Sequence, residues 1–164
     1  MNVYDGQKMI DLLKPHQYVP TDSPDEADVA ILNTCHIREK AEHKVFSDLG
    51  RLRQSQTKRK EDGMEMVIAV GGCVGQAEGQ EIINQAPYVS MVFGPQSLHK
   101  IPEMLAQVEE KVNGKRKKAV DIDFPPESKF DYLPKAEKTG VSAFLSVQEG
   151  CDKFCHFCVV PYTR

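Results

Sequence analysis

This chain of 164 residues lacks several features that would assign it to a well-defined class. It has no uninterrupted apolar run of about 18 residues, which a transmembrane helix requires. It also lacks the sequence patterns of serine hydrolases, zinc proteases and phosphate-binding loops. Its formal net charge is −3, so the basic excess typical of a nucleic-acid-binding domain is missing. What remains, 40% hydrophobic and 27% charged residues, is the composition of a soluble globular protein with no membrane association.

Cysteine is scarce, but the positions of the five cysteines are informative. An odd count without the spacing of a disulfide framework favours a reducing compartment, so we expect a cytoplasmic location. Cys151, Cys155 and Cys158 form a C-x3-C-x2-C pattern. Three thiolates this close can hold three irons of a four-iron cluster and leave the fourth iron open. The spacing therefore indicates a cluster that binds an external molecule, and S-adenosylmethionine (SAM) is the expected one.

A zinc site is the alternative interpretation of the same loop. His156 could complete a Cys3His ligand set, since structural zinc takes four nitrogen or sulfur ligands. Its place between the second and third cysteines would strain a tetrahedral site, and structural zinc usually draws its ligands from two separated segments. The alternative function is therefore a non-enzymatic module that binds zinc or transfers electrons. A ferredoxin-like carrier would need a fourth cysteine near the loop, and the sequence has none there.

Hydrophobic periodicity predicts alternating helices and strands ahead of this loop. The expected helices span residues 4–15, 37–56, 79–85 and 97–112, and the expected strands span residues 27–33, 65–70 and 89–93. This alternation implies a parallel sheet covered on both faces, a doubly wound α/β domain over residues 1–123. Residues 124–140 have the proline and charge content of a linker. A strand over 141–148 is then expected to open a second domain, 141–164, and to lead into the cysteine loop.

Cys35 and Cys73 each follow the end of a predicted parallel strand. The carboxyl ends of such strands share one edge of the sheet, where α/β proteins bind their ligands. Cys35 also precedes a predicted helix, whose N-terminal N–H groups favour a thiolate. Gly71 and Gly72 lack side chains, which would leave room for a bulky ligand beside Cys73. From position alone, a shared ligand site and a buried structural role for the two cysteines are equally open.

Several motifs, in the same order along the chain, resemble those of one enzyme family. Residues 151–158 resemble the C-x3-C-x-Φ-C signature of radical SAM enzymes, with Phe157 at the aromatic position. Residues 33–42 resemble the NTC-x-IREKAE run of tRNA methylthiotransferases of the MiaB type, a run that differs in the ribosomal-protein methylthiotransferases. Residues 71–73, 93–96 and 148–152 fit the same family.

The resemblance implies two 4Fe–4S clusters. The first, held by the three loop cysteines, binds SAM, with Phe157 near the adenine. Whether the loop holds a cluster or zinc, Phe154 and Phe157 are expected to shield it from water. The second is an auxiliary cluster on Cys35, Cys73 and a third cysteine. In the family, reductive cleavage of SAM gives a 5′-deoxyadenosyl radical, which removes hydrogen from C2 of N6-isopentenyladenosine at position 37 of tRNA, where a methylthio group is then attached. The implied partners are tRNA and an electron donor such as flavodoxin, and the chain is expected to be a monomer.

The chain departs from the family pattern at both ends. It begins inside a turn that follows the family's first strand, and it stops at Arg164, just after the cysteine loop. The first strand with its cysteine, most of the barrel and an RNA-binding domain are expected to be missing, so the chain alone is expected to be inactive. The expected fold is thus a doubly wound α/β domain followed by the first strand and cluster loop of a truncated radical SAM α/β barrel.

Overall fold

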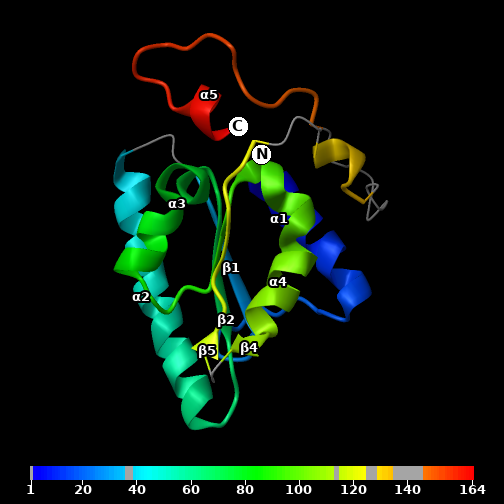
Figure 1. Cartoon of the computed structure of the whole chain (residues 1–164), viewed down its shortest axis with the longest axis vertical. Helices are drawn as coiled ribbons and strands as arrows, with labels where there is room; N and C mark the ends of the chain where they lie inside the picture. Colours follow the sequence, from blue (N-terminus) through cyan, green and yellow to red (C-terminus); the bar gives the residue numbers. More distant parts are fainter. Residues whose placement is uncertain (1, 36–38, 113–114, 125–128, 135–145) are drawn as a thin grey trace.

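The structure, a computed structural model, describes residues 2–35, 39–112, 115–124, 129–134 and 146–164. Four parallel strands form a central sheet with helices on both faces (Figure 1). The strands lie in the order β1 (Val29–Thr34), β2 (Val67–Gly72), β3 (Met91–Phe93) and β6 (Ala119–Asp121). The predicted doubly wound α/β fold is confirmed, and β6 is an additional strand that was not expected from the sequence.

Alternate residues of each strand face opposite helix layers, because the side-chain period of a strand is two. On one face, Val67 and Ala69 of β2 pack with α1 (Asn2–Leu13) and α4 (Ile101–Glu109). On the other face, Ile68 and Val70 pack with α2 (Glu39–Glu61) and α3 (Cys73–Gln85), as the two helix pairs in Figure 1 show. All of β2 is buried, which is why it reads as a continuous apolar run.

The predicted helices differ from the observed ones mainly at their ends. The prediction for α2 stopped at residue 56, whereas the helix continues to Glu61 with basic residues in its last turn, where they interact favourably with the helix dipole. The prediction for α3 began at residue 79, whereas the helix begins at Cys73 and is only kinked at Gly79, where φ is 42°. The start of this helix is therefore immediately beside one of the candidate site residues.

The helix predicted over residues 97–112 is divided in two. A 3-10 helix, η2 (Pro95–Lys100), precedes α4, and α4 ends at Glu109. The chain then enters a short antiparallel pair, β4 (Lys111–Val112) and β5 (Lys115–Arg116), which leads to β6. A second 3-10 helix, η1 (Lys14–His16), extends α1.

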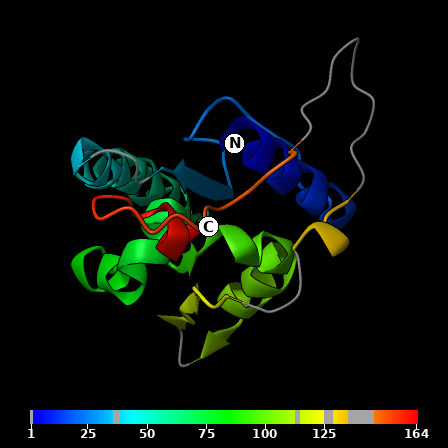
Figure 2. The same ribbon diagram turned by 90° about the horizontal axis from the view of Figure 1, so that it is seen from above.

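The predicted linker and second domain are described only in part, since residues 125–128 and 135–145 lie outside the described residues. A 3-10 helix, η3 (Lys129–Asp131), lies within the predicted linker. Of the strand predicted over 141–148, residues 146–148 are described and belong to no strand, because none of the described strands pairs with them. Residues 146–164 instead run over the end of the sheet and finish in the short α5 (Val160–Thr163), as Figure 2 shows. None of the described helices is long and apolar enough to cross a membrane.

Candidate functional site at the carboxyl edge of the sheet

Cys35 and Cys73 come directly after two neighbouring strands. β1 and β2 pair in parallel with Thr34 opposite Gly72, so the next residue on each strand is a cysteine. Cys35 is half-buried, whereas Cys73 is buried and is the first residue of α3. This is the shared edge that the sequence predicts for the two cysteines. Ligand binding by them stays a prediction.

The hydroxyl of Thr34 fixes the backbone on both sides of Cys73. Its Oγ1 donates a hydrogen bond to the carbonyl oxygen of Gly71 at 2.6 Å and accepts one from the N–H of Val74 at 3.1 Å. The first N–H groups of a helix have no partner inside the helix, and Gly72, at the N-cap position of α3, has no side chain to offer. A buried hydroxyl from the neighbouring strand therefore caps the helix that carries Cys73.

The two glycines before Cys73 allow close packing inside the protein. A Cβ atom on Gly71 would lie 2.4 Å from the ring of Phe93, and one on Gly72 would lie 2.4 Å from the carbonyl oxygen of Thr34. Gly72 also has a φ of +90°, in the region that favours glycine. Protein atoms thus occupy the space beside both glycines. The expectation that these glycines leave room for a bulky ligand is therefore wrong.

Four buried charged side chains form a network of ion pairs that we call the edge charge cluster: Asp5, Lys129, Glu149 and Arg164. Arg164 donates one terminal N–H to Glu149 Oε1 and another to Asp5 Oδ2, both at 2.6 Å. Lys129 Nζ donates to Glu149 Oε1 at 2.7 Å and to the carbonyl oxygen of Pro95 at 3.0 Å. Two carboxylates and two cations balance each other, which is the condition under which charges are tolerated in a protein interior.

Arg164 also contacts the sulfur of Cys73, because its Nε donates to Sγ at 3.3 Å. Burial acts to lower the pKa of Arg164, but hydrogen bonding and charge attraction to Asp5 outweigh that effect, with the Cys73 contact adding to it. The pKa of Arg164 therefore lies above its ordinary value. The sulfur of Cys73 thus has a permanent cation beside it.

The edge charge cluster joins parts of the chain whose local sequence does not predict a contact. The hydrogen bond between Asp5 and Arg164 spans 159 positions, and that between Arg164 and Cys73 spans 91. The sequence analysis assigned no role in such a cluster to Asp5, Lys129 or Glu149. A charged residue in an ordinary helix or linker gives no signal of burial, so these three were missed.

The C-x3-C-x2-C loop lies beside the same edge, at the protein surface. Cys151 and Cys155 are exposed and Cys158 is half-buried. Phe157 is 92% exposed and Phe154 is 62% exposed, so neither ring shields the loop from water as expected. The only ring contact recorded for Phe154 among the described residues is edge-on, with Tyr162. Both rings are therefore left largely open to solvent by the described residues.

The edge and the loop both supply cysteine sulfurs, which are the usual ligands of iron–sulfur clusters. Cys73 lies at a helix N-terminus and receives an N–H donor from Arg164, and both features stabilise a ligating thiolate. The loop supplies three cysteines at suitable spacing. However, across the described residues no three His, Cys, Asp or Glu side chains are gathered as metal ligands. The residues that would hold clusters are nevertheless Cys35 and Cys73 at the edge and the three loop cysteines.

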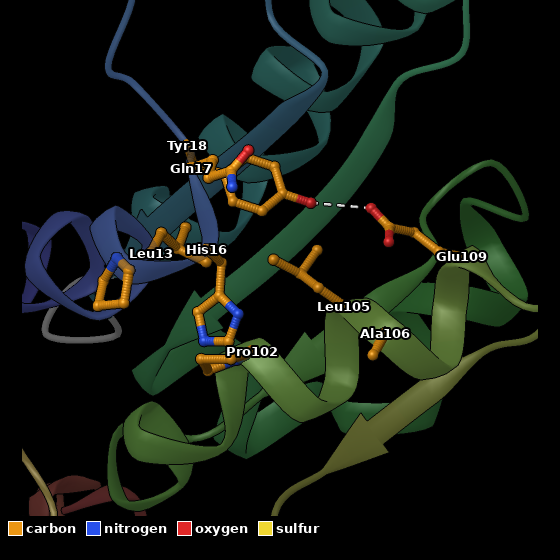
Figure 3. Close-up of a pocket in the computed structure, with 9 residues that line it drawn as sticks. Leu13, His16, Gln17, Tyr18, Pro102, Leu105, Ala106 and Glu109 are labelled. Atoms are coloured by element: carbon orange, nitrogen blue, oxygen red, sulfur yellow. Dashed lines mark hydrogen bonds between the residues drawn. The ribbon is translucent and has the colours of Figure 1, made fainter.

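A separate hollow of about 240 Å³ lies between the C-terminal end of α1 and α4 (Figure 3). Tyr18 donates a hydrogen bond across it to Glu109 Oε1 at 2.8 Å. Burial, and then this hydrogen bond to Glu109, raise the pKa of Tyr18 to about 12. The sequence predicts no site there, and the residues that line the hollow include no cysteine. They are Leu13, Pro15, His16, Gln17, Tyr18, Pro102, Leu105, Ala106 and Glu109.

The sequence also matches a known protein family. Residues 1–94 match the family described as "Uncharacterized protein family UPF0004". The match covers more than half of the 164 residues and includes Cys35 and Cys73, whereas the C-x3-C-x2-C loop lies outside it. The matched region thus includes β1, β2 and β3 with the two edge cysteines, and it ends before α4 and β6. The chain therefore belongs to the UPF0004 family, whose domain forms the N-terminal part of methylthiotransferases.

Proposed function

We propose that this protein acts in the transfer of a methylthio group to C2 of N6-isopentenyladenosine at position 37 of tRNA. The observation that carries the proposal is the shared edge, where Cys35 and Cys73 follow neighbouring strands in register. Membership of UPF0004 supports the class of reaction. The run at residues 33–42 supports tRNA as the substrate, because it resembles the tRNA enzymes more than the ribosomal-protein enzymes.

The proposed cofactors are two 4Fe–4S clusters and SAM. The loop cysteines would hold one cluster, leaving an iron for SAM, and Cys35 and Cys73 would contribute to the auxiliary cluster. Bound SAM would supply the radical chemistry that activates the substrate carbon. The chain's own part is to present thiolates and to surround them with fixed N–H donors, as Arg164 does at Cys73.

The proposed partners are tRNA and a one-electron donor such as flavodoxin, in the cytoplasm. The net charge of −3 means that this chain contributes little general attraction for phosphate. We therefore expect weak binding of tRNA by this chain, with a shallow dependence on salt concentration. A steep salt dependence would indicate that tRNA contacts a basic surface outside the described residues.

The reaction is tested in the organism that carries the gene. Deleting the gene is expected to remove 2-methylthio-N6-isopentenyladenosine from tRNA and to leave N6-isopentenyladenosine, as measured by mass spectrometry of tRNA digests. Reintroducing the wild-type gene restores the product, whereas a gene with Cys155→Ala does not. Unchanged tRNA in the deletion strain would show that the proposed substrate is wrong.

The cofactors are tested on the purified chain. Anaerobic reconstitution with iron and sulfide is expected to give a brown protein. When SAM is added to the reduced protein, its electron paramagnetic resonance spectrum is expected to change. Cys155→Ala removes the response to SAM, whereas Cys73→Ala lowers the iron content and keeps that response. A colourless protein with one zinc per chain would instead support the non-enzymatic zinc module.

A further inference from the structure

The guanidinium of Arg164 is held in one orientation by two buried carboxylates. Asp5 and Glu149 each accept one of its terminal N–H groups at 2.6 Å. The guanidinium is planar and its N–H groups point in fixed directions, so two anchored corners determine where the third donor points. That third donor is Nε–H, and it points at the sulfur of Cys73.

We propose that Arg164 is a positioning residue for Cys73: clamped by Asp5 and Glu149, its guanidinium fixes the Cys73 sulfur and controls access to it. The side chain of Arg164 is 4% exposed and Cys73 is 6% exposed, so their contact lies away from solvent. The inference concerns the thiol of this chain and holds for any ligand or reagent that the sulfur meets. It is therefore independent of the proposed function.

Arg164 also helps to close the loop that carries the other three cysteines. Glu149 and Arg164 flank this loop and are joined by their ion pair. The backbone also closes here, since a Cβ atom on Gly150, where φ is +82°, would lie 3.0 Å from the carbonyl oxygen of Arg164. The two ends of the loop thus meet beside Cys73. Arg164 therefore sets both the position of the edge sulfur and the point where the cysteine loop is attached.

Lysine cannot replace arginine in this role. A lysine has one nitrogen, which can remain between the carboxylates of Asp5 and Glu149 but cannot also direct a separate donor at Cys73. Arg164→Lys is therefore expected to keep the buried charge balance and most of the thermal stability. It loses only the contact with the sulfur. This variant separates positioning of Cys73 from a general contribution to folding.

The test measures how fast iodoacetamide alkylates each cysteine of the native chain, using peptide mass spectrometry. Cys35 in the same sample is the internal reference, because global unfolding would accelerate both cysteines together. In Arg164→Lys the rate at Cys73 relative to Cys35 is expected to rise about tenfold, since one hydrogen bond to a charged group no longer opposes local opening. Arg164→Gln is expected to raise it further.

Arg59→Gln is the matched control. Arg59 is also buried, with a side chain 5% exposed, and it pairs with Asp28 at the other end of α2 from the cysteines. The control is expected to leave the ratio of the Cys73 and Cys35 rates unchanged. An unchanged ratio in both Arg164 variants would overturn the proposal.

A second measurement reports on the contact without any reagent. In a 15N–1H spectrum the Nε–H signal of Arg164 is expected to be protected from exchange with water. Cys73→Ala is expected to shift that signal and reduce its protection, whereas Cys35→Ala leaves it in place. A signal that is the same in Cys73→Ala and in the wild type would show that Nε does not bond to the sulfur, and the positioning role would be lost.

Discussion

The sheet and the segment of residues 146–164 are held in place by different forces. Strands β2 and β3 are buried on both faces by aliphatic and aromatic side chains. The segment exposes its two phenylalanines and is attached through Glu149 and Arg164 of the edge charge cluster. Apolar packing sums many small contacts, whereas a charge cluster depends on each of its few partners. The sheet should therefore tolerate the loss of a single contact, whereas the attachment of the segment depends on individual charged residues.

The largest effect is expected inside the sheet. Phe93 is fully buried, and its ring lies against the backbone of Gly71, so Phe93→Ala is expected to cost about 3–5 kcal/mol of unfolding free energy. Phe157→Ala, in the exposed loop, is expected to change it by less than about 0.5 kcal/mol. Urea unfolding of both variants measures the difference. Equal costs would show that the two regions share one apolar core.

A smaller and more local effect is expected in the edge charge cluster. Glu149→Gln leaves Lys129 and Arg164 without one of their two buried carboxylates. This is expected to lower the free energy of opening the segment to water by about 2–3 kcal/mol. Hydrogen exchange is expected to accelerate in residues 146–164 and to stay slow in β2. Glu110→Gln is the control, because its ion pair with Lys117 is exposed. Uniform acceleration over the whole chain would argue against a separately attached segment.

The boundary between the two regions is tested at Thr34. Thr34→Val removes the hydroxyl that caps α3 and leaves the Val74 N–H buried without that acceptor, at an expected cost of about 1–2 kcal/mol. Thr57→Val, on the exposed face of α2, is the control, since its hydroxyl bonds only within the helix. Thermal unfolding gives the cost. If Thr34→Val loses no more stability than Thr57→Val, the Thr34 hydroxyl does not stabilise the edge.

The smallest effect is expected at the hollow between α1 and α4. Tyr18→Phe removes a partly exposed hydrogen bond to Glu109 and is expected to cost about 0.5–1 kcal/mol near neutral pH. The pKa of Tyr18 is raised from 10.0 to about 12, so the unfolded chain loses this proton first.

The contribution of Tyr18 to stability is therefore fully present below pH 10.0 and is lost as pH rises towards 12. In Tyr18→Phe this part of the alkaline loss is expected to disappear. Unfolding by urea at about pH 8 and about pH 11 measures it. Tyr162→Phe, at an exposed position, is the control. If wild type and Tyr18→Phe lose the same unfolding free energy between these two pH values, ionisation of Tyr18 does not contribute to the alkaline loss of stability.

The fold was predictable where apolar runs are long. β1 and β2 are six residues each and are rich in apolar residues, so they were predicted as strands, whereas β6 has only three residues and follows a run of basic residues. The start of α3 was missed because glycines at 75 and 79 resemble a loop. Gly75 is required there because a Cβ atom would lie 2.6 Å from the carbonyl oxygen of Phe93. Tertiary packing therefore overrides the low helix propensity of glycine at this point.

The candidate site was predictable only where topology determines it. Two cysteines that follow neighbouring parallel strands must lie at the same edge of the sheet, and Cys35 and Cys73 do. The edge charge cluster follows from no such rule, because Asp5 could pair with any cation that the fold brings near. For the loop, sequence identifies the sulfur donors. The local sequence does not specify how exposed the cysteines of this loop and its two phenylalanines are.

The bond between Asp5 and Arg164 has a consequence for the order of folding. It closes a loop of 159 positions, and the entropy cost of closing so long a loop is recovered only after the intervening sheet has formed. During synthesis the strands and helices on either side of Cys73 emerge well before Arg164 does. A newly made chain therefore passes through an interval in which the sheet is assembled and the Cys73 sulfur is still uncovered. We expect the Cys73 sulfur to be more accessible to a ligand in that interval than after Arg164 has docked against it.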